Sequence, residues 1–219
     1  MRFDEAAQLL ATLPASLPNA PAELMPTLLP TEGDEKPRFR GFPTGPLREA
    51  AVLILIHPAA DGEAHLTLIE RAGGDHIHAG QISLPGGAIE DGETTIDAAL
   101  REAREEVNLD VDQAGVRVVG ELPASDVTVS GYRVHPIVAF ADRTPEVSPD
   151  YVETAAVFTA PLAAFIPPAP IEIATDERDG YRLRYGGYRI GRYHVWGATA
   201  GILGRLGVWL AAQAGDGQT

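Results

Sequence analysis

Along much of this chain, apolar residues either alternate with polar ones or form blocks of strand length. The longest block, residues 50–57, reads AAVLILIH and fits a strand that is buried on both faces of a sheet. The turn residues Asp61-Gly62-Glu63 follow it, and residues 65–71 fit the partner strand of a hairpin. Further strands are predicted at residues 116–122, 132–141 and 152–159.

An amphipathic helix is predicted at residues 95–108. Four apolar residues recur there at helical spacing and fall on one side, which predicts a face that packs inward: Ile96, Leu100, Ala103 and Val107. Thr94 is a suitable N-cap, and Asp97 three residues later completes a box-like pair with it. Asn108 is a plausible end for the helix, because Asn tolerates the left-handed conformation better than most residues.

Weaker patterns predict the other elements. Helices are expected at residues 3–13, 161–165 and 195–212, and a solvent-facing hairpin is expected at residues 181–193 around Gly186-Gly187. Residues 14–47 contain eight prolines, which predicts an extended arm or linker and no core element. Strands on both sides of one central helix together predict a compact α/β domain.

A cluster of carboxylates lies on the helix at residues 95–108. Glu102, Glu105 and Glu106 are neighbours on a face other than the apolar one, and like charges at that spacing cost roughly 0.2–0.5 kcal/mol per pair. A bound divalent cation would make this arrangement favourable instead of costly, because Mg²⁺ and Mn²⁺ take oxygen ligands. The upstream turn Pro85-Gly86-Gly87 lets backbone approach a ligand closely. A solvated Glu/Arg helix face is the competing interpretation, and the combined spacing favours a metal site.

The segment from Gly87 to Leu109 resembles the Nudix box, G-x5-E-x7-R-E-U-x-E-E-x-G-U, in which U is a bulky aliphatic residue. Seven residues match this motif: Gly87, Glu93, Arg101, Glu102, Glu105, Glu106 and Leu109. Ala103 is smaller than the usual aliphatic residue, and Asn108 replaces the final glycine. Within the motif, Arg101 is placed to pair with Glu105, four residues later, or with Glu93.

The segment before the box, residues 66–87, resembles the signature of coenzyme A pyrophosphatases of the Nudix superfamily. Four short stretches match: Leu66-Thr67, Arg71, Gly80-Gln81-Ile82-Ser83 and Pro85-Gly86-Gly87. His76 stands where that signature usually has Arg, and Leu84 stands where it usually has Phe. Downstream, residues 196–200 read WGATA and are similar to the closing W-G-x-T-A of the same family.

This resemblance implies a fold, a reaction and a cofactor. The expected fold is a Nudix-type α/β/α sandwich with a mixed β-sheet over residues 46–212. An N-terminal helix and Pro-rich arm would precede it over residues 1–45, and a tail would follow over residues 213–219. The expected reaction is hydrolysis of the diphosphate of coenzyme A or a derivative, giving 3′,5′-ADP and 4′-phosphopantetheine, with Mg²⁺ or Mn²⁺ as cofactor.

The resemblance also implies roles for individual residues. The expected metal ligands are the three glutamates of the helix, Glu102, Glu105 and Glu106. Arg101 and Glu93 are expected to orient these carboxylates, and the general base is left open among Glu102, Glu105 and Glu153. The residues expected near the phosphates or the substrate are Arg71, His76, Gln81, Gly86 and Gly87.

The composition excludes several classes of binding partner for this chain. The formal net charge is −14, which argues against binding to nucleic acid, since that needs basic surface. There are no cysteines, which excludes disulfides and thiolate metal sites and is compatible with a cytoplasmic location. No apolar run approaches the length of a membrane span, so no membrane partner is expected. The Pro-rich arm, or the Tyr and Arg residues of segment 181–193, would suit a homodimer.

Two rival interpretations stay open. The first is a Nudix pyrophosphatase for another diphosphate, such as ADP-ribose or a dinucleotide, which the departures at His76 and Leu84 allow. The second is a non-catalytic nucleotide-binding sensor that kept the fold. A sensor would be expected to have a broken glutamate set, whereas Glu102, Glu105 and Glu106 are intact here.

Overall fold

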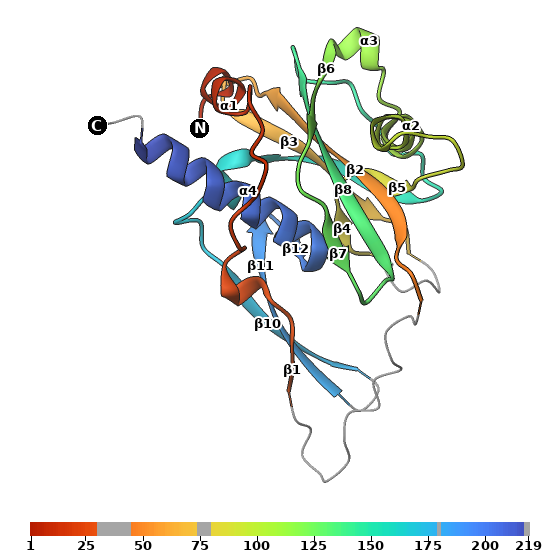
Figure 1. Cartoon of the computed structure of the whole chain (residues 1–219), viewed down its shortest axis with the longest axis vertical. Helices are drawn as coiled ribbons and strands as arrows, with labels where there is room; N and C mark the ends of the chain where they lie inside the picture. Colours follow the sequence, from red (N-terminus) through yellow and green to blue (C-terminus); the bar gives the residue numbers. More distant parts are fainter. Residues whose placement is uncertain (30–44, 74–79, 179–180, 217–219) are drawn as a thin grey trace.

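The computed structural model describes residues 1–29, 45–73, 80–178 and 181–216. It has a large sheet with helices on both faces and a smaller second sheet beside it (Figure 1). None of the helices in these ranges combines the length and the apolar character that a membrane crossing needs.

The large sheet is built around strand β2 (Arg48–Pro58), which contains the longest apolar block. Strand β2 pairs in parallel with β8 (Tyr132–Ala141) and antiparallel with β3 (Ala64–Arg71), so the sheet is mixed. The other strands of this sheet are β4 (Ile82–Ser83), β5 (Gly86–Ala88), β6 (Val116–Glu121), β7 (Ser125–Val127) and β9 (Thr154–Pro161). The predicted strands of this sheet are confirmed with ends that shift by one or two residues, whereas the short strands β4, β5 and β7 were not predicted.

In the described residues, four α-helices lie against the large sheet: α1 (Phe3–Leu9), α2 (Thr95–Val107), α3 (Val111–Ala114) and α4 (Gly197–Asp216). Successive side chains of β2 enter two separate cores, because they alternate across the sheet. Ile54 and Ile56 are buried in one core with residues of α1 and α4. Leu53 and Leu55 are buried in the other with residues of α2 and α3. Figure 1 shows α2 and α4 on opposite sides of the sheet, and the predicted α/β/α sandwich is confirmed.

Helix α2 begins and ends as the sequence predicts. The Thr94 hydroxyl accepts the Asp97 N–H at 3.1 Å, and the Asp97 carboxylate accepts the Thr94 N–H at 3.3 Å. Asn108 follows the helix in the left-handed conformation with φ 52°. The prediction that all three glutamates lie apart from the buried face is wrong for Glu106, which is among the buried residues of the helix. This burial matters for the chemistry described below.

The second sheet contains β1 (Thr27–Leu29), β10 (Glu172–Arg178), β11 (Tyr181–Ile190) and β12 (Tyr193–Trp196). Strand β11 is its centre and pairs antiparallel with the other three strands. Tyr188 and Val195 belong to the core that α4 covers. Helix α4 starts two residues later than predicted, because Val195 and Trp196 are part of β12. The short helix predicted at residues 161–165 is present as the 3₁₀ helix η2 (Leu162–Phe165).

The prediction of a hairpin turning at Gly186-Gly187 is wrong, since β11 runs straight through both glycines. The two glycines allow Glu23 and His194 to pack closely against β11. A Cβ on Gly186 would lie 2.8 Å from the carbonyl carbon of Glu23, and a Cβ on Gly187 would collide with His194. The segment is not solvent-facing either, because Tyr188 is 2% exposed.

The prediction that residues 14–47 contain no core element is wrong in part. Leu24 lies in the 3₁₀ helix η1 (Ala22–Leu24), is 2% exposed and joins the core beneath α4. Strand β1 adds to the edge of β11. Prolines flank these short elements and mask their pattern in the sequence. The division of the chain at residues 45 and 212 stays a prediction.

Candidate functional site

Arg101 lies at the centre of a group of carboxylates near the start of α2. Its Nε donates to Oε1 of Glu93 at 2.7 Å, and its Nη2 donates to Oε2 of Glu93 and to the carbonyl of Ala88, both at 3.0 Å. Its Nη1 donates to Oε1 of Glu102 and to Oε2 of Glu105, both at 2.9 Å. Arg101 therefore pairs with both Glu93 and Glu105, the two partners considered for it from the sequence. The Arg101 guanidinium also holds the pKa of the Glu93 carboxyl below its usual range.

Glu106 occupies the buried side of the same helix. Its carboxylate is 2% exposed, and Oε2 accepts the Gly86 N–H at 2.8 Å. The Arg71 guanidinium, at the end of β3, lies 3.4 Å from Oε1. Burial raises the pKa of Glu106 to about 7, while the Gly86 N–H and Arg71 act in the opposite direction. A carboxylate this far from water needs more positive charge around it than these two donors supply.

The glycine turn makes room for these carboxylates. A Cβ on Gly86 would lie 2.6 Å from the Cα of Val52, so strand β5 could not lie against β2 with a larger residue there. A Cβ on Gly87 would lie 2.7 Å from Oε2 of Glu102. The Glu102 carboxylate is 14% exposed, and burial raises its pKa against the opposing effect of Arg101. Because neither glycine has a side chain, the backbone can approach β2 and the Glu102 carboxylate closely.

Glu153 reaches the group from a different part of the chain. It precedes β9 in a tight turn, and its negative charge contributes to raising the pKa values of Glu102 and Glu106. Asp150 builds this turn, since its carboxylate accepts the N–H of Glu153 at 3.2 Å and that of Thr154 at 2.8 Å. Asp150 was not among the residues predicted from the sequence. The available signal was an Asp directly after Pro149, a typical turn composition.

Some of the residues expected near the substrate lie close to one another in the structure. Arg71 and Gln81 face each other across the start of the loop, where the Arg71 N–H donates to the Gln81 carbonyl at 3.0 Å. Arg71 also contacts Glu106, and Glu106 contacts Gly86. His76 lies outside the residues that the structure describes. Arg71, Gln81 and the glycine turn therefore form one edge of the carboxylate group.

The donor set suits a hard divalent cation. Five carboxylates, those of Glu93, Glu102, Glu105, Glu106 and Glu153, are accompanied by the two guanidinium groups of Arg71 and Arg101. Oxygen ligands of this kind are those that Mg²⁺ and Mn²⁺ prefer. In the described part of the chain, no three acidic or histidine side chains enclose a cation as they stand, because Arg101 and the Gly86 N–H hold them. The chemistry of the donors fits a metal ion, whose charge would compete with Arg101 and the Gly86 N–H for the same carboxylate oxygens.

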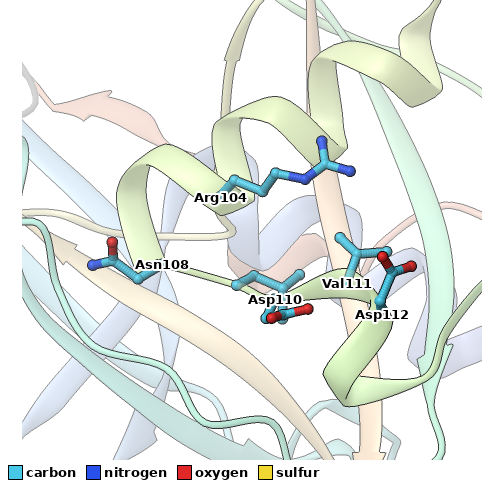
Figure 2. Close-up of a pocket in the computed structure, with 6 residues that line it drawn as sticks. Arg104, Asn108, Asp110, Val111 and Asp112 are labelled. Atoms are coloured by element: carbon cyan, nitrogen blue, oxygen red, sulfur yellow. The ribbon is translucent and has the colours of Figure 1, made fainter.

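An open pocket in the described residues lies apart from this group. It surrounds the end of α2 and the start of α3, and its lining residues are Arg104, Asn108, Leu109, Asp110, Val111 and Asp112 (Figure 2). Arg104 and Asn108 are exposed, and neither is among the residues that Arg101 contacts. The pocket is open and lacks the buried carboxylates described above, so we place the candidate site at Arg101 and Glu106.

Comparisons with known proteins give the family of this chain. The model of the NUDIX domain family matches residues 47–177. A protein named uncharacterized Nudix hydrolase NudL, from Escherichia coli O7:K1, is 38% identical over 170 residues, which is 76% of this chain and 84% of that protein. Its counterpart in Escherichia fergusonii is 37% identical over the same length and the same shares of both chains.

Among solved structures, the Nudix hydrolase RenU from M. smegmatis is similar with a TM-score of 0.46 and 25% identity, covering 55% of this chain and 74% of that one. The match to the family model and the similarity to NudL establish the family by themselves. The chain belongs to the Nudix hydrolases and is a Nudix pyrophosphatase.

Proposed function

We propose that this chain hydrolyses the diphosphate bond of coenzyme A or of a coenzyme A derivative in a metal-dependent reaction. The observation that carries the hydrolytic part is the buried Glu106 carboxylate beside Glu102, held by the glycine turn. The coenzyme A part is supported by the resemblance of residues 66–87 and 196–200 to coenzyme A pyrophosphatases. The products would be 3′,5′-ADP and 4′-phosphopantetheine.

Nudix hydrolases use divalent cations, and we assign the ligands in this chain to Glu102, Glu105 and Glu106. When bound, Mg²⁺ or Mn²⁺ would neutralise charge on the phosphate oxygens and lower the pKa of the attacking water. Arg101 and Glu93 hold the ligand carboxylates in position through the contacts at 2.7–3.0 Å.

Water attacks phosphorus, the bridging P–O bond breaks, and a carboxylate oxygen takes the proton from the water. Glu102, Glu105 and Glu153 are the candidates for this base, and each lies in or beside the Arg101 group. Arg71 and the Gly86 N–H contact Glu106. We assign them, with Gln81 and Gly87, to the phosphates. His76 is assigned to the same side of the substrate by the resemblance alone.

The test is product analysis after incubating purified protein with coenzyme A and either Mg²⁺ or Mn²⁺. ADP-ribose and NADH serve as competing diphosphates, and Glu106→Gln serves as the variant, because the amide keeps the shape and can still accept the Gly86 N–H. Selective, metal-dependent release of 3′,5′-ADP by the wild type alone supports the proposal.

Three results would contradict different parts of this proposal. Preferential cleavage of ADP-ribose or NADH would keep the metal chemistry and overturn the substrate. Wild-type turnover in a folded Glu106→Gln protein would overturn the assignment of Glu106, and no cleavage by a folded, metal-loaded wild type would favour a binding role. A homodimer and a cytoplasmic location remain predictions.

A further inference from the structure

The turn that carries Glu153 also presents two large apolar side chains to water. Tyr151 is 76% exposed and Val152 is 79% exposed, which makes them the most exposed large apolar residues of the described chain. They directly precede Glu153, whose charge is felt at both Glu102 and Glu106. An aromatic and an aliphatic side chain are therefore exposed in the turn that carries Glu153.

Tyr151 is held in an unfavourable backbone conformation. Its φ is 64°, and in the described residues only Asn108 shares a positive φ among residues other than glycine. Asn108 has an evident reason, since Asn commonly ends a helix in this way. Tyr has no such local advantage, and a bulky side chain in the left-handed region is an outlier. Such outliers persist where the surrounding structure enforces them, and they cluster at functional sites.

The surrounding contacts enforce this conformation and tie the turn to the site. The Asp150 N–H donates to the carbonyl of Glu106 at 3.2 Å, and the Ser148 N–H donates to the carbonyl of Val107 at 3.1 Å. On the other side, the Ala72 N–H donates to the carbonyl of Glu153 at 2.7 Å. The turn is thus anchored both to the end of α2 and to the segment after β3. These bonds fix the backbone on both sides of Tyr151 and Val152, and one of them ends on Glu106 itself.

We propose that Tyr151 is a specificity-determining residue that stacks on the nucleobase of the substrate, with Val152 as an adjoining apolar contact. The inference rests on the proposed diphosphatase function, because the carboxylates would take the metal-bound phosphates and leave the base at the rim. Neither side chain carries charge, so neither suits the phosphates. An aromatic ring binds the flat face of any base by stacking, and apolar neighbours exclude water from that contact.

The test combines two substrates with three variants. The substrates are P1-adenosine P2-methyl diphosphate and the matching ribosyl methyl diphosphate that lacks adenine. Tyr151→Gly removes the ring and also the backbone strain, whereas Tyr151→Phe keeps a ring. Met25→Ala is the matched control, because Met25 is 64% exposed but lies next to β1 in the second sheet. Binding of 1,N⁶-ethenoadenosine diphosphate in the presence of Ca²⁺, followed by quenching of its fluorescence, gives a readout that does not depend on turnover.

We expect Tyr151→Gly to raise KM for the adenine substrate about 10-fold, to leave KM for the base-free substrate unchanged, and to weaken the quenching. The same variant should raise the Tm by about 2–4 °C, because glycine adopts a positive φ without strain. Tyr151→Phe and Met25→Ala should retain the wild-type KM. A residue with a purely structural role would give the opposite combination, a lower Tm with KM unchanged.

Failure of this inference is distinguishable from failure of the proposed function. Equal KM changes for both substrates, or none, in a protein whose wild type hydrolyses diphosphates would overturn the role of Tyr151 alone. A wild type that hydrolyses neither substrate and does not bind the etheno nucleotide would overturn both.

Discussion

Two side chains in this molecule, Arg101 on α2 and His135 on β8, each hold more than one carboxylate. Arg101 contacts Glu93, Glu102 and Glu105, as described above. His135 lies between two carboxylates, since Nδ1 is 2.6 Å from Oε1 of Glu121 on β6 and Nε2 is 2.6 Å from Oε2 of Glu49 on β2. Both ring nitrogens face acceptors, and a protonated imidazole donates to both.

The two groups differ in burial and in charge balance. The carboxylates of Glu49 and Glu121 are 48% and 37% exposed, so water screens the excess charge around His135. Glu102 and Glu106 are 14% and 2% exposed, and they face further carboxylates instead of water. The His135 group is balanced as a structural contact. The Arg101 group has more buried carboxylates than its cations can balance. Buried, unbalanced carboxylates therefore mark the site better than the number of acidic residues does.

Gly87→Ala should give the largest effect, because the added Cβ would lie 2.7 Å from Oε2 of Glu102 and displace that carboxylate. We expect kcat to fall roughly 10²–10³-fold, the range for loss of one precisely placed electrostatic group. Stability should change little, since only the end of a flexible side chain has to move. Steady-state kinetics with saturating Mg²⁺ and a thermal melt measure the two quantities.

Gly73→Ala is the matched control for this change. Gly73 lies in the loop after β3, and a Cβ there would meet nothing within 4 Å. It should retain wild-type kcat and Tm. Wild-type turnover in Gly87→Ala would show that Glu102 does not need its observed position.

Arg101→Lys should have the next largest effect. A lysine keeps the charge but cannot bind Glu93 with two nitrogens while also reaching Glu102 and Glu105. We expect turnover to fall roughly 10-fold to 100-fold, as for loss of a group that orients metal ligands. The apparent Mg²⁺ affinity, measured by titration of activity, should weaken in parallel.

Arg133→Lys is the comparison for Arg101→Lys. Arg133 makes a two-nitrogen contact with Asp126 at 2.8 and 3.2 Å, but both side chains are about half exposed. This variant should leave turnover and Mg²⁺ affinity unchanged. Equal losses in both variants would mean that the Arg101 contacts matter for general stability and not for the site.

Features that depend on neighbouring residues in the chain could be predicted from the sequence. Helix α2 was predictable, because its caps at Thr94 and Asn108 and its spacing are local signals. Strand β2 was predictable for a similar reason, since a strand covered on both faces is a continuous apolar run. The glutamates, Arg101 and Gly87 were recognisable from spacing alone. All of these features act within about two dozen residues of chain.

Features that depend on distant partners were missed or wrong. The straight path of β11 through Gly186 depends on the backbone of Glu23, and the burial of Leu24 depends on α4. The burial of Glu106 depends on Gly86 and Arg71, which approach from other strands. No local pattern encodes these contacts, because each side of the contact has an ordinary sequence on its own.

The smallest expected effect is a pH-dependent loss of stability in His135→Gln. Burial lowers the pKa of His135, but the bonds to Glu121 and Glu49 outweigh it and raise the pKa above the usual value of 6.5. A raised histidine pKa stabilises the fold fully below the unfolded value, and this contribution disappears as the pH rises through the folded value. The variant should therefore be less stable than wild type at pH 5.5–6, by about 1 kcal/mol or less, with the difference shrinking toward pH 9.

Denaturant unfolding across this pH range, with a chelator present, measures the difference between the two proteins. Glu106, whose pKa burial raises to about 7, titrates in the same window but is present in both proteins and cancels in the difference. Because Glu121 also accepts the Thr95 hydroxyl at 2.8 Å, the His135 group touches the first residue of α2. Turnover per folded molecule should nevertheless stay unchanged in His135→Gln. A large loss would mean that the His135 and Arg101 groups act together through the start of α2, which would contradict the distinction drawn between them.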